Sequence, residues 1–432
     1  MNDACRPTLG SYIHVKHGFA FKGEYFTDET TPDVLVTPGN FAIGGGFQDT
    51  KLKYYAGPVP DDYVLQAGDL VVTMTDLSKA GDTLGYPALI PESVGRRYLH
   101  NQRVGLIEIK HDAEADKRFL FYRLRADDYR HHILATASGS SVRHTSPGRI
   151  CEFETTLPPI DEQRAIAGVL GALDDKIEQN RQTARALERL GRAIFRAWYV
   201  DFEPVKAKAE GSSAFPGMPQ PVFDALPTRF VDSAIGPVPL GWEIKPLDSV
   251  AEFLNGLALQ KYPPREDGTD LPVIKIAQLR KGSTEGADTS NDSISEIYKI
   301  RDGDLLFSWS GTLEAAFWFG GPGALNQHLF KVTSDEYPQW LVFEWVQHHL
   351  PEFRLIAASK ATTMGHIKRG HLSQALVAVP PPMFLERSNQ VIAPLFEIRA
   401  MAQLESRRLA EMRDYLLPKL LSGQLRVEVR HG

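Results

Sequence analysis

The chain has 432 residues, of which 43 % are hydrophobic and 24 % charged, two cysteines and a formal net charge of −6. These values exclude a mainly disordered, collagen-like or disulfide-stapled chain, and the net charge is not that of an obvious nucleic-acid binder. Because no stretch approaches 18 apolar residues and no basic start leads into an apolar run, we expect a cytoplasmic protein without a membrane span.

Residues 1–160 predict a first globular domain. Short apolar runs at 34–36, 70–72 and 104–109 predict strands, and residues 117–135 predict a helix. Basic residues gather near this helix, and a local positive field can attract a polyanion although the whole chain is negative. A solvated helix face is the alternative explanation of the same charges.

A long amphipathic helix is predicted over residues 161–202. Its apolar positions are spaced alternately by four and three residues up to Trp198, and Asn180 takes one position of this seam. Such a repeat over four heptads is typical of a coiled coil, and two separate helices, each on its own domain core, are the alternative. Residues 203–240 hold seven prolines, which predicts an extended, semi-rigid linker.

The second half of the chain repeats this organisation. Residues 241–385 predict a second domain, with strands at 273–276 and 305–307 and a helix at 339–357, and residues 386–425 predict a second long helix. Short sequence matches occur in the same order in both halves, which predicts a tandem duplication.

The seams of the two helices also match, with an offset of 225 residues (405 − 180) that places polar Glu405 at the position of polar Asn180. Antiparallel pairing is preferred because it puts the second domain where the first helix ends. The positions assigned to helix pairing are Ile166, Leu170, Leu173, Ile177, Asn180, Leu187, Leu395, Ile398, Glu405, Leu409, Met412 and Leu416.

No catalytic or metal-binding motif is recognisable. The sequence contains no phosphate-binding loop, no dinucleotide-binding glycine pattern and no H-E-x-x-H pair. We therefore expect a binding protein with neither catalytic residues nor a metal site of its own.

Several motifs resemble those of type I restriction-modification specificity subunits. The runs LPPIDEQRAI (157–166), LDDKI (173–177) and FRAWYVDFEP (195–204) resemble the central region of that family, and RDYLLPKLLSG (413–423) resembles its distal region. The run GPVPLGWE (236–243) resembles the start of its second target-recognition domain. The likeness covers nearly the full length. After the second proline step, however, the chain lacks the Glu-Gln pair present at 162–163, which leaves the start of the second helix open.

The resemblance implies an α+β fold with two similar mixed α/β target-recognition domains. Each domain is followed by one long helix, and the two helices pair as an antiparallel coiled coil with a pseudo-twofold arrangement. It also implies a non-catalytic subunit that reads an asymmetric bipartite site in double-stranded DNA. Two methyltransferase subunits, which use S-adenosylmethionine, and in the nuclease two restriction subunits, which use ATP and Mg, are the implied partners. A protein-only scaffold with two binding domains on a coiled-coil spacer is the alternative function.

Candidate DNA contacts lie at matched positions of the two halves. Basic and hydroxyl side chains suit phosphate oxygens, and the Asn-Gln pairs suit base edges, although turn capping explains those pairs equally well. Trp198, Tyr199 and Phe202 are predicted as a partner surface, with packing against the second domain as the equal alternative. The DNA-binding candidates are Asn101, Gln102, Arg103, Ser140, Ser141, Arg143, His144, Asn326, Gln327, His328, Thr362, Thr363, His366, Lys368 and Arg369.

Overall fold

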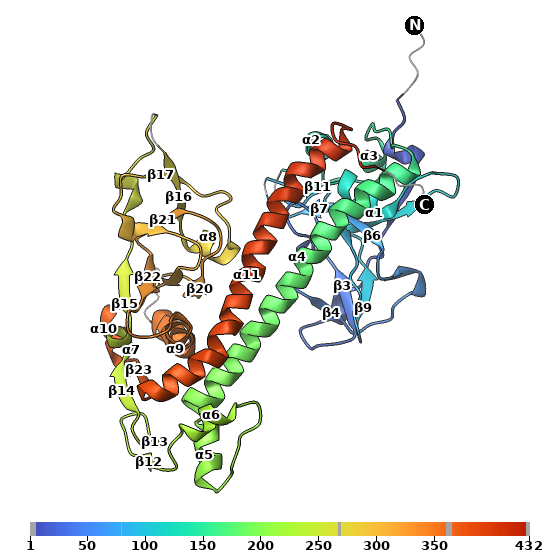
Figure 1. The fold of residues 1–432 in the computed structure, drawn as a ribbon. Helices are drawn as coiled ribbons and strands as arrows, with labels where there is room; N and C mark the ends of the chain where they lie inside the picture. Colours follow the sequence, from blue (N-terminus) through green and yellow to red (C-terminus); the bar gives the residue numbers. More distant parts are fainter. Residues whose placement is uncertain (1–5, 79, 141, 267–268, 360–364, 429–432) are drawn as a thin grey trace. The chain divides into compact units, whose positions relative to one another are not determined.

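The computed structural model describes residues 6–78, 80–140, 142–266, 269–359 and 365–428 (Figure 1). The chain forms two compact units: unit 1 is Met1–Lys176 with Leu409–Gly432, and unit 2 is Ile177–Arg408. The long helices α4 and α11 each contribute one end to each unit. Within the described ranges, no helix is long and apolar enough to cross a membrane.

Two main sheets form the domain part of unit 1. One is antiparallel with the order β1-β10-β6-β8, and the other has the order β2-β4-β3-β9-β5 with β3 and β9 parallel. Leu70 and Val72 of β6 pack toward the helices, whereas Val71 packs toward the second sheet. The first sheet is thus covered on both faces, which explains the uninterrupted apolar run of β6. The elements are β1 (Ile13–His17), β2 (Phe26–Thr27), β3 (Asp33–Val36), β4 (Lys53–Tyr55), β5 (Val64–Leu65), β6 (Leu70–Thr73), β7 (Thr75–Asp76), β8 (Pro87–Leu89), β9 (Arg97–His100), β10 (Val104–Ile109), α1 (Lys117–Arg123), α2 (Asp127–Thr136), β11 (Arg143–His144), α3 (Pro147–Cys151) and α4 (Ile160–Phe195).

Unit 2 repeats this topology. Its antiparallel sheet β15-β22-β19-β20 corresponds to β1-β10-β6-β8, and its second sheet β17-β16-β21-β18 again contains one parallel pair, β16 with β21. In β19, Leu305 and Phe307 pack toward helix α9, while Leu306 packs toward the second sheet. The predicted tandem duplication is therefore confirmed by the fold. The elements are α5 (Glu203–Ala209), α6 (Gln220–Asp224), β12 (Phe230–Val231), β13 (Val238–Pro239), β14 (Glu243–Pro246), α7 (Leu247–Val250), β15 (Glu252–Asn255), β16 (Asp270–Ile274), α8 (Ile276–Lys281), β17 (Thr289–Asn291), β18 (Lys299–Ile300), β19 (Leu305–Ser308), β20 (Ala315–Phe317), β21 (Gly323–Leu325), β22 (Leu329–Thr333), α9 (Gln339–Ser359), α10 (Arg369–Gln374), β23 (Leu376–Val379) and α11 (Pro382–Leu421).

The segment 203–240 is packed, so the prediction of an extended linker is wrong. Val205, Val222 and Phe223 are buried in the same core as the second domain. Prolines occupy the first turns of α5 and α6, where the missing N–H has no helical partner to lose. The apolar residues between the prolines therefore hold this segment against the second domain, and the prolines mark the starts of its helices.

Each long helix has a buried, hydrogen-bonded polar side chain near its start, Gln163 in α4 and Ser388 in α11. Near the start of α4, the buried Gln163 side chain donates to the carbonyls of Glu114 and Pro158 and accepts from the N–H of Asp116. The position 225 residues later is Ser388, whose buried hydroxyl lies 2.6 Å from the Tyr199 hydroxyl. The second helix thus begins at Pro382, ahead of the predicted 386, and uses a different anchor in place of the Glu-Gln pair.

The long helices pair in antiparallel fashion within each unit (Figure 1). In unit 1, Ile166 near the start of α4 shares a core with Leu420 near the end of α11. In unit 2, Gly191 near the end of α4 lies against the ring of Phe396, in the first half of α11. A Cβ at Gly191 would lie 3.2 Å from that ring, so the small residue allows the close approach.

The seam on α11 differs from the prediction at alternate positions. Ile398 and Met412 are 44 % and 51 % exposed, so their assignment to helix pairing is wrong. Arg399 and Arg413, one residue further on, face α4 instead and form ion pairs with it. A prediction from hydrophobic spacing assigns the apolar residue to the seam. It cannot detect that the adjacent arginine is buried there and paired with an acid on the other helix.

The other predicted seam positions divide by burial. Asn180 donates from Nδ2 to Oε2 of Glu405 at 2.8 Å, so these two polar positions face each other. Ile166, Leu170, Ile177 and Asn180 are buried, Leu173, Leu187, Leu395, Leu409 and Leu416 are partly buried, and Glu405 is exposed.

The aromatic residues after α4 are core residues, which corrects their prediction as a partner surface. Trp198, Tyr199 and Phe202 are at most 6 % exposed and belong to the core of unit 2. A π-helical turn at Arg196–Val200 and a positive φ of 52° at Phe202 redirect the chain there. The Tyr199 ring lies 5.5 Å from that of Trp242, so the rings fix the helix end to the second domain.

Glu344 on α9 is a buried carboxyl beside the helix pair in unit 2. Burial, assisted by the charge of Glu188, raises the pKa of Glu344 to about 7, and Arg192 and Arg399 only partly oppose this. Its Oε1 has no hydrogen-bond partner in the described part of the chain. The neutral form is therefore the one that the fold favours.

We predict that Glu344→Gln stabilises the protein at alkaline pH. Between its unfolded pKa of about 4.3 and its folded value, the native carboxyl binds more protons than the unfolded one, so the free energy of unfolding falls as pH rises. The glutamine variant lacks this titration, and its advantage should reach on the order of 3 kcal/mol above pH ~8. Urea unfolding at about pH 5 and about pH 8.5 measures it, and parallel pH profiles would contradict the assignment.

Candidate nucleic-acid interface

A tight turn between β9 and β10 presents two polar side chains in unit 1. The N–H of Phe19 donates to the carbonyl of His100, and the N–H of Gln102 donates to the carbonyl of Phe19. Oδ1 of Asn101 accepts from the N–H of Arg103 at 3.2 Å, so Asn101 caps the turn. The side chains of Gln102 and Arg103 are exposed beyond it.

Unit 2 builds the same turn between β21 and β22. The N–H of Leu257 donates to the carbonyl of Leu325, the N–H of Gln327 donates to the carbonyl of Leu257, and Oδ1 of Asn326 accepts from the N–H of His328 at 3.2 Å. Turn capping, the alternative foreseen for the Asn-Gln pairs, thus describes both asparagines. The two residues after each asparagine are the ones that the turn presents.

A glycine fixes each turn against the neighbouring strand. A Cβ at Gly18 would lie 2.1 Å from the backbone oxygen of Asn101, and a Cβ at Gly256 would lie 2.2 Å from that of Asn326. No side chain fits at either position without moving the backbone. The turns are therefore rigid platforms, and the same requirement for glycine recurs in both halves of the chain.

Two further segments join the turn in unit 1. The N–H of Met74 donates to the carbonyl of Arg103, and the N–H of Thr145 donates to the carbonyl of Met74. The Thr75 hydroxyl lies 3.2 Å from Nδ1 of His144. Residues 101–103, 73–76 and 143–145 thus lie together in a group that we call the first edge, and Gln102, Arg103 and His144 are its exposed members.

Unit 2 assembles the corresponding second edge from residues 326–328, 308–310 and 365–367. The N–H of Ile367 donates to the carbonyl of Trp309, and the Ser310 hydroxyl lies 2.9 Å from Nδ1 of His328. The Trp309 ring lies 5.9 Å from that of His328 and 6.3 Å from that of His366. The two sequence windows predicted to touch DNA are therefore adjacent in each unit.

Sequence reasoning missed Trp309. Its indole N–H donates to Asn255 and to the Gln327 carbonyl, and its partly buried ring lies beside His328 at the second edge. The repeat could have found it, because Gly-Asp-Leu occurs at 68–70 and at 303–305, and Trp309 follows the second run by the same spacing as Met74 follows the first.

A loop beside the first edge is organised by the buried carboxylate of Asp76. Oδ1 accepts from the N–H of Ser78 at 2.6 Å, and Oδ2 accepts from the hydroxyl of Thr83 at 2.8 Å and the N–H of Leu84 at 3.1 Å. Burial alone would raise the pKa of Asp76, but these hydrogen bonds outweigh it and hold the pKa below its usual value. The loop therefore depends on an ionised Asp76.

Most of the positive charge near the first edge is used inside unit 1. Arg123 forms two hydrogen bonds with Asp128, Arg125 pairs with Asp174, and Arg130 donates to the carbonyls of Gly81 and Leu84. Arg103 is different, since within the described ranges its exposed guanidinium forms no hydrogen bond or ion pair. The free charge at the first edge is thus concentrated on the turn.

The remaining candidates vary in their surroundings. Ser140, His144 and Lys368 are exposed, and Arg143 and His366 are partly buried. Arg369 is exposed and donates to the carbonyl of Phe253. Ser141, Thr362 and Thr363 lie outside the described residues.

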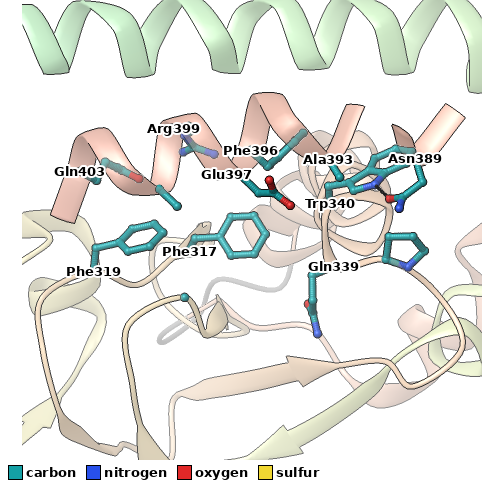
Figure 2. Close-up of a pocket in the computed structure, with 13 residues that line it drawn as sticks. Phe317, Phe319, Gln339, Trp340, Asn389, Ala393, Phe396, Glu397, Arg399 and Gln403 are labelled. Carbon is teal, nitrogen blue, oxygen red and sulfur yellow. Dashed lines mark hydrogen bonds between the residues drawn. The ribbon is translucent and has the colours of Figure 1, made fainter. Parts of the chain in front are cut away.

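Unit 2 also contains an apolar cavity of about 290 Å³ beside α11 (Figure 2). The rings of Phe317, Phe319, Trp340 and Phe396 line it, and Trp340 donates from Nε1 to Asn389 at 2.7 Å. No cluster of three or more His, Cys, Asp or Glu that could hold a metal occurs among the described residues. The cavity offers shape and apolar surface to a ligand, without a nucleophile–base pair among its lining residues.

Comparison with known proteins identifies the family. Residues 43–189 and 239–397 match the family described as "Type I restriction modification DNA specificity domain". The chain is 26 % identical over 326 residues to the type I restriction enzyme MjaIX specificity subunit of Methanocaldococcus jannaschii, covering 72 % of this chain and 69 % of that one. It is 22 % identical over 452 residues to the EcoBI specificity subunit of Escherichia coli, covering 98 % and 87 %. The S subunit structure from M. genitalium shares the fold over 97 % of both chains, with a TM-score of 0.55 and 14 % identity.

We predict that Gly18→Ala and Gly256→Ala each lower the free energy of unfolding by at least about 2 kcal/mol, because the new Cβ collides with backbone. Gly23→Ala and Gly370→Ala are the matched controls, since nothing lies within 4 Å of a Cβ at either position. Thermal unfolding compares the four variants. If the test variants unfold like their controls, the turns are not held as rigidly as this contact requires.

Proposed function

Because this chain belongs to the family of type I restriction-modification DNA specificity domains, we propose that it is the non-catalytic specificity subunit of such a system. In this role, unit 1 and unit 2 each read one half of a bipartite site in double-stranded DNA. The family match over both halves of the chain supports this proposal, as does the pair of similar edges.

The observation that carries the proposal is the repeated edge with different side chains. Both edges have the same backbone and the same Gly and Asn, yet one turn ends in Arg103 and the other in His328. An arginine can donate two hydrogen bonds to guanine O6 and N7, and a glutamine can read adenine. Since the side chains that end the two turns differ, we expect two different half-sites and an asymmetric target.

Trp309 gives the second edge an aromatic face that the first edge lacks. An indole ring can contact the methyl group of thymine or stack on an unpaired base. Lys368 near the second edge and Ser140 and His144 at the first suit phosphate oxygens, which set register and not sequence. Base readout is thus assigned to the turns and to Trp309, and phosphate binding to the flanking segments.

The implied partners follow from the same proposal. Two methyltransferase subunits would supply S-adenosylmethionine chemistry, and two restriction subunits would use ATP and Mg. Ile398 and Met401 on α11 are 44 % and 60 % exposed and lie one turn apart on one helix face. Exposed apolar side chains so placed suit a partner helix, so we assign methyltransferase docking to this face.

The protein-only scaffold remains the second candidate, favoured by the negative net charge of the chain. The two candidates differ in their salt dependence. A DNA reader loses affinity steeply with salt because counterions are released on binding, whereas a scaffold needs no DNA at all.

We predict that deleting this gene removes one split, asymmetric adenine-methylation motif from the genome of its source. Restoring the gene with Arg103→Ala should relax one position in one half of that motif and leave the other half unchanged, because only one edge is altered. Losing a bidentate contact costs about 1–3 kcal/mol of discrimination. Methylation mapping by long-read sequencing gives both results.

Arg96→Ala is the control for charge alone, since Arg96 is an exposed arginine of the same unit outside the first edge. A methylome unchanged by the deletion, together with a salt-insensitive partner complex, would support the scaffold. An intact motif with Arg103→Ala would remove Arg103 from base readout while leaving the function in place.

We also predict that Ile398→Ser with Met401→Ser reduces co-purification of the methyltransferase subunit at least about tenfold, through loss of apolar contact. The unfolding temperature should stay that of the wild type, because both side chains are already exposed. Val231→Ser, at a 40 % exposed position away from the helices, is the control. Undiminished co-purification would place the docking surface elsewhere.

A further inference from the structure

The seam between α4 and α11 contains two ion pairs. In unit 1, Nη1 of Arg413 lies 2.7 Å from Oδ1 of Asp174. Burial would raise the pKa of Asp174, but the charges of Arg125 and Arg413 and their hydrogen bonds outweigh it and hold this pKa below its usual value. In unit 2, Nη2 of Arg399 lies 3.0 Å from Oε2 of Glu188.

The repeat relates these two pairs. Adding the offset of 225 to Asp174 gives Arg399, and adding it to Glu188 gives Arg413. The two pairs therefore occupy equivalent places in the duplicated helices. At both places the acid is on α4 and the arginine is on α11, so the charges are sorted by helix.

A third pair lies between these two. Asn180 faces Glu405, and these residues are equivalent under the same offset. A position that pairs with its own equivalent marks the centre of the pseudo-twofold arrangement. In this pair the single negative charge lies on α11, opposite a neutral amide on α4.

We propose that this sorting of charge makes α4 and α11 a partner-selective pair, which admits the two different helices of this chain and rejects pairing of either helix with a second copy of itself. In the same antiparallel register, α4 with α4 would place Asp174 against Glu188 twice. Likewise α11 with α11 would place Arg399 against Arg413 twice, and Glu405 against Glu405.

Burial makes this sorting effective. The side chains of Arg399 and Arg413 are only 10 % and 17 % exposed, and those of Asp174 and Glu188 are 24 % and 34 % exposed. Charges in such places are screened little by salt, and an unmatched one is strongly destabilising. Apolar seam contacts alone would suit all three pairings, since both helices have apolar residues at other equivalent seam positions, such as Ile177 and Ala402. The ionic pairs discriminate among the pairings, as polar seam residues do in coiled coils.

The test uses full-length chains with reversed charges. One variant, Asp174→Arg with Glu188→Arg, carries arginine at all four places, and a second, Arg399→Glu with Arg413→Glu, carries acid at all four. A third chain carries all four substitutions and so exchanges the charges of the two helices. In that chain each pair keeps the total charge it has in the wild type. The other charged groups at the two pairs, Arg125, Asp414, Arg192 and Glu344, therefore meet the same total charge as before.

We expect each double variant to unfold at least about 4 °C below the wild type, and the fourfold variant to recover most of the loss. Co-expressed with different tags, the two double variants should co-purify in equal amounts, because α4 of each now matches α11 of the other. Two differently tagged wild-type chains, co-expressed in the same way, show how much co-purification occurs when each chain can pair its own helices. Glu178→Arg, at an exposed ion pair of the same helix, controls for surface charge and should change neither result.

Three outcomes would overturn the proposal. Double variants as stable as the wild type would show that the ion pairs contribute nothing to the stability of the helix pairing. A fourfold variant no better than the double variants would show that the charges do not act as matched pairs. Recovery in the fourfold variant without co-purification of the two double variants beyond the wild-type reference would show that the pairs stabilise the seam but do not select the partner.

Discussion

The antiparallel contact between α4 and α11 is the constraint on which the rest of the molecule depends. Each domain core is completed by one end of each helix: Ile166 and Leu420 share the core of unit 1, and Phe195 and Ile392 share that of unit 2. Neither half of the chain therefore contains all of the residues that its domain buries. A chain with this arrangement couples the folding of both recognition domains to one helix pairing. Correct pairing of these two helices is therefore required for both domains to complete their cores.

The ion pairs in the seam are part of larger networks that reach into the domains. Asp174 accepts hydrogen bonds from Arg413, Arg125 and the Tyr122 hydroxyl, and Arg125 also donates to the carbonyl of Gly44. Through Arg125, one carboxylate thus connects both long helices and helix α1 with the loop between β3 and β4 of the second sheet. In a low-dielectric setting such a network is strong only when every member is satisfied. A substitution that leaves one charge unmatched therefore disturbs a domain as well as the coiled coil.

The sequence was sufficient for the features that depend on regular patterns. The duplication, the strands at 70–72 and 305–307 and the two long helices follow from period and order, and the structure contains them. The exposure of Ile398 and Met412 could not be predicted from the sequence. Hydrophobic spacing assigns the apolar residue to the seam even where the neighbouring arginine is the buried, paired one. The prediction of an extended linker at 203–240 was wrong for a related reason. It gave more weight to the prolines than to the apolar residues between them, such as Phe223. At the candidate interface, matched motifs found the turns, but they could not show that asparagine caps them or that Trp309 lies beside His328.

The two edges present different side chains on the same backbone, which suits the proposed reading of two different half-sites. The backbone of each turn is held by glycine packing and by an asparagine cap, so its shape does not depend on the residues that it displays. Arg103 and His328 can therefore differ without cost to the platform. A protein built in this way separates stability from specificity: the shared residues preserve the geometry, and the varied ones meet the ligand. The charge-sorted seam complements this division, because two different readers are useful together only if each is joined to the other and not to a copy of itself.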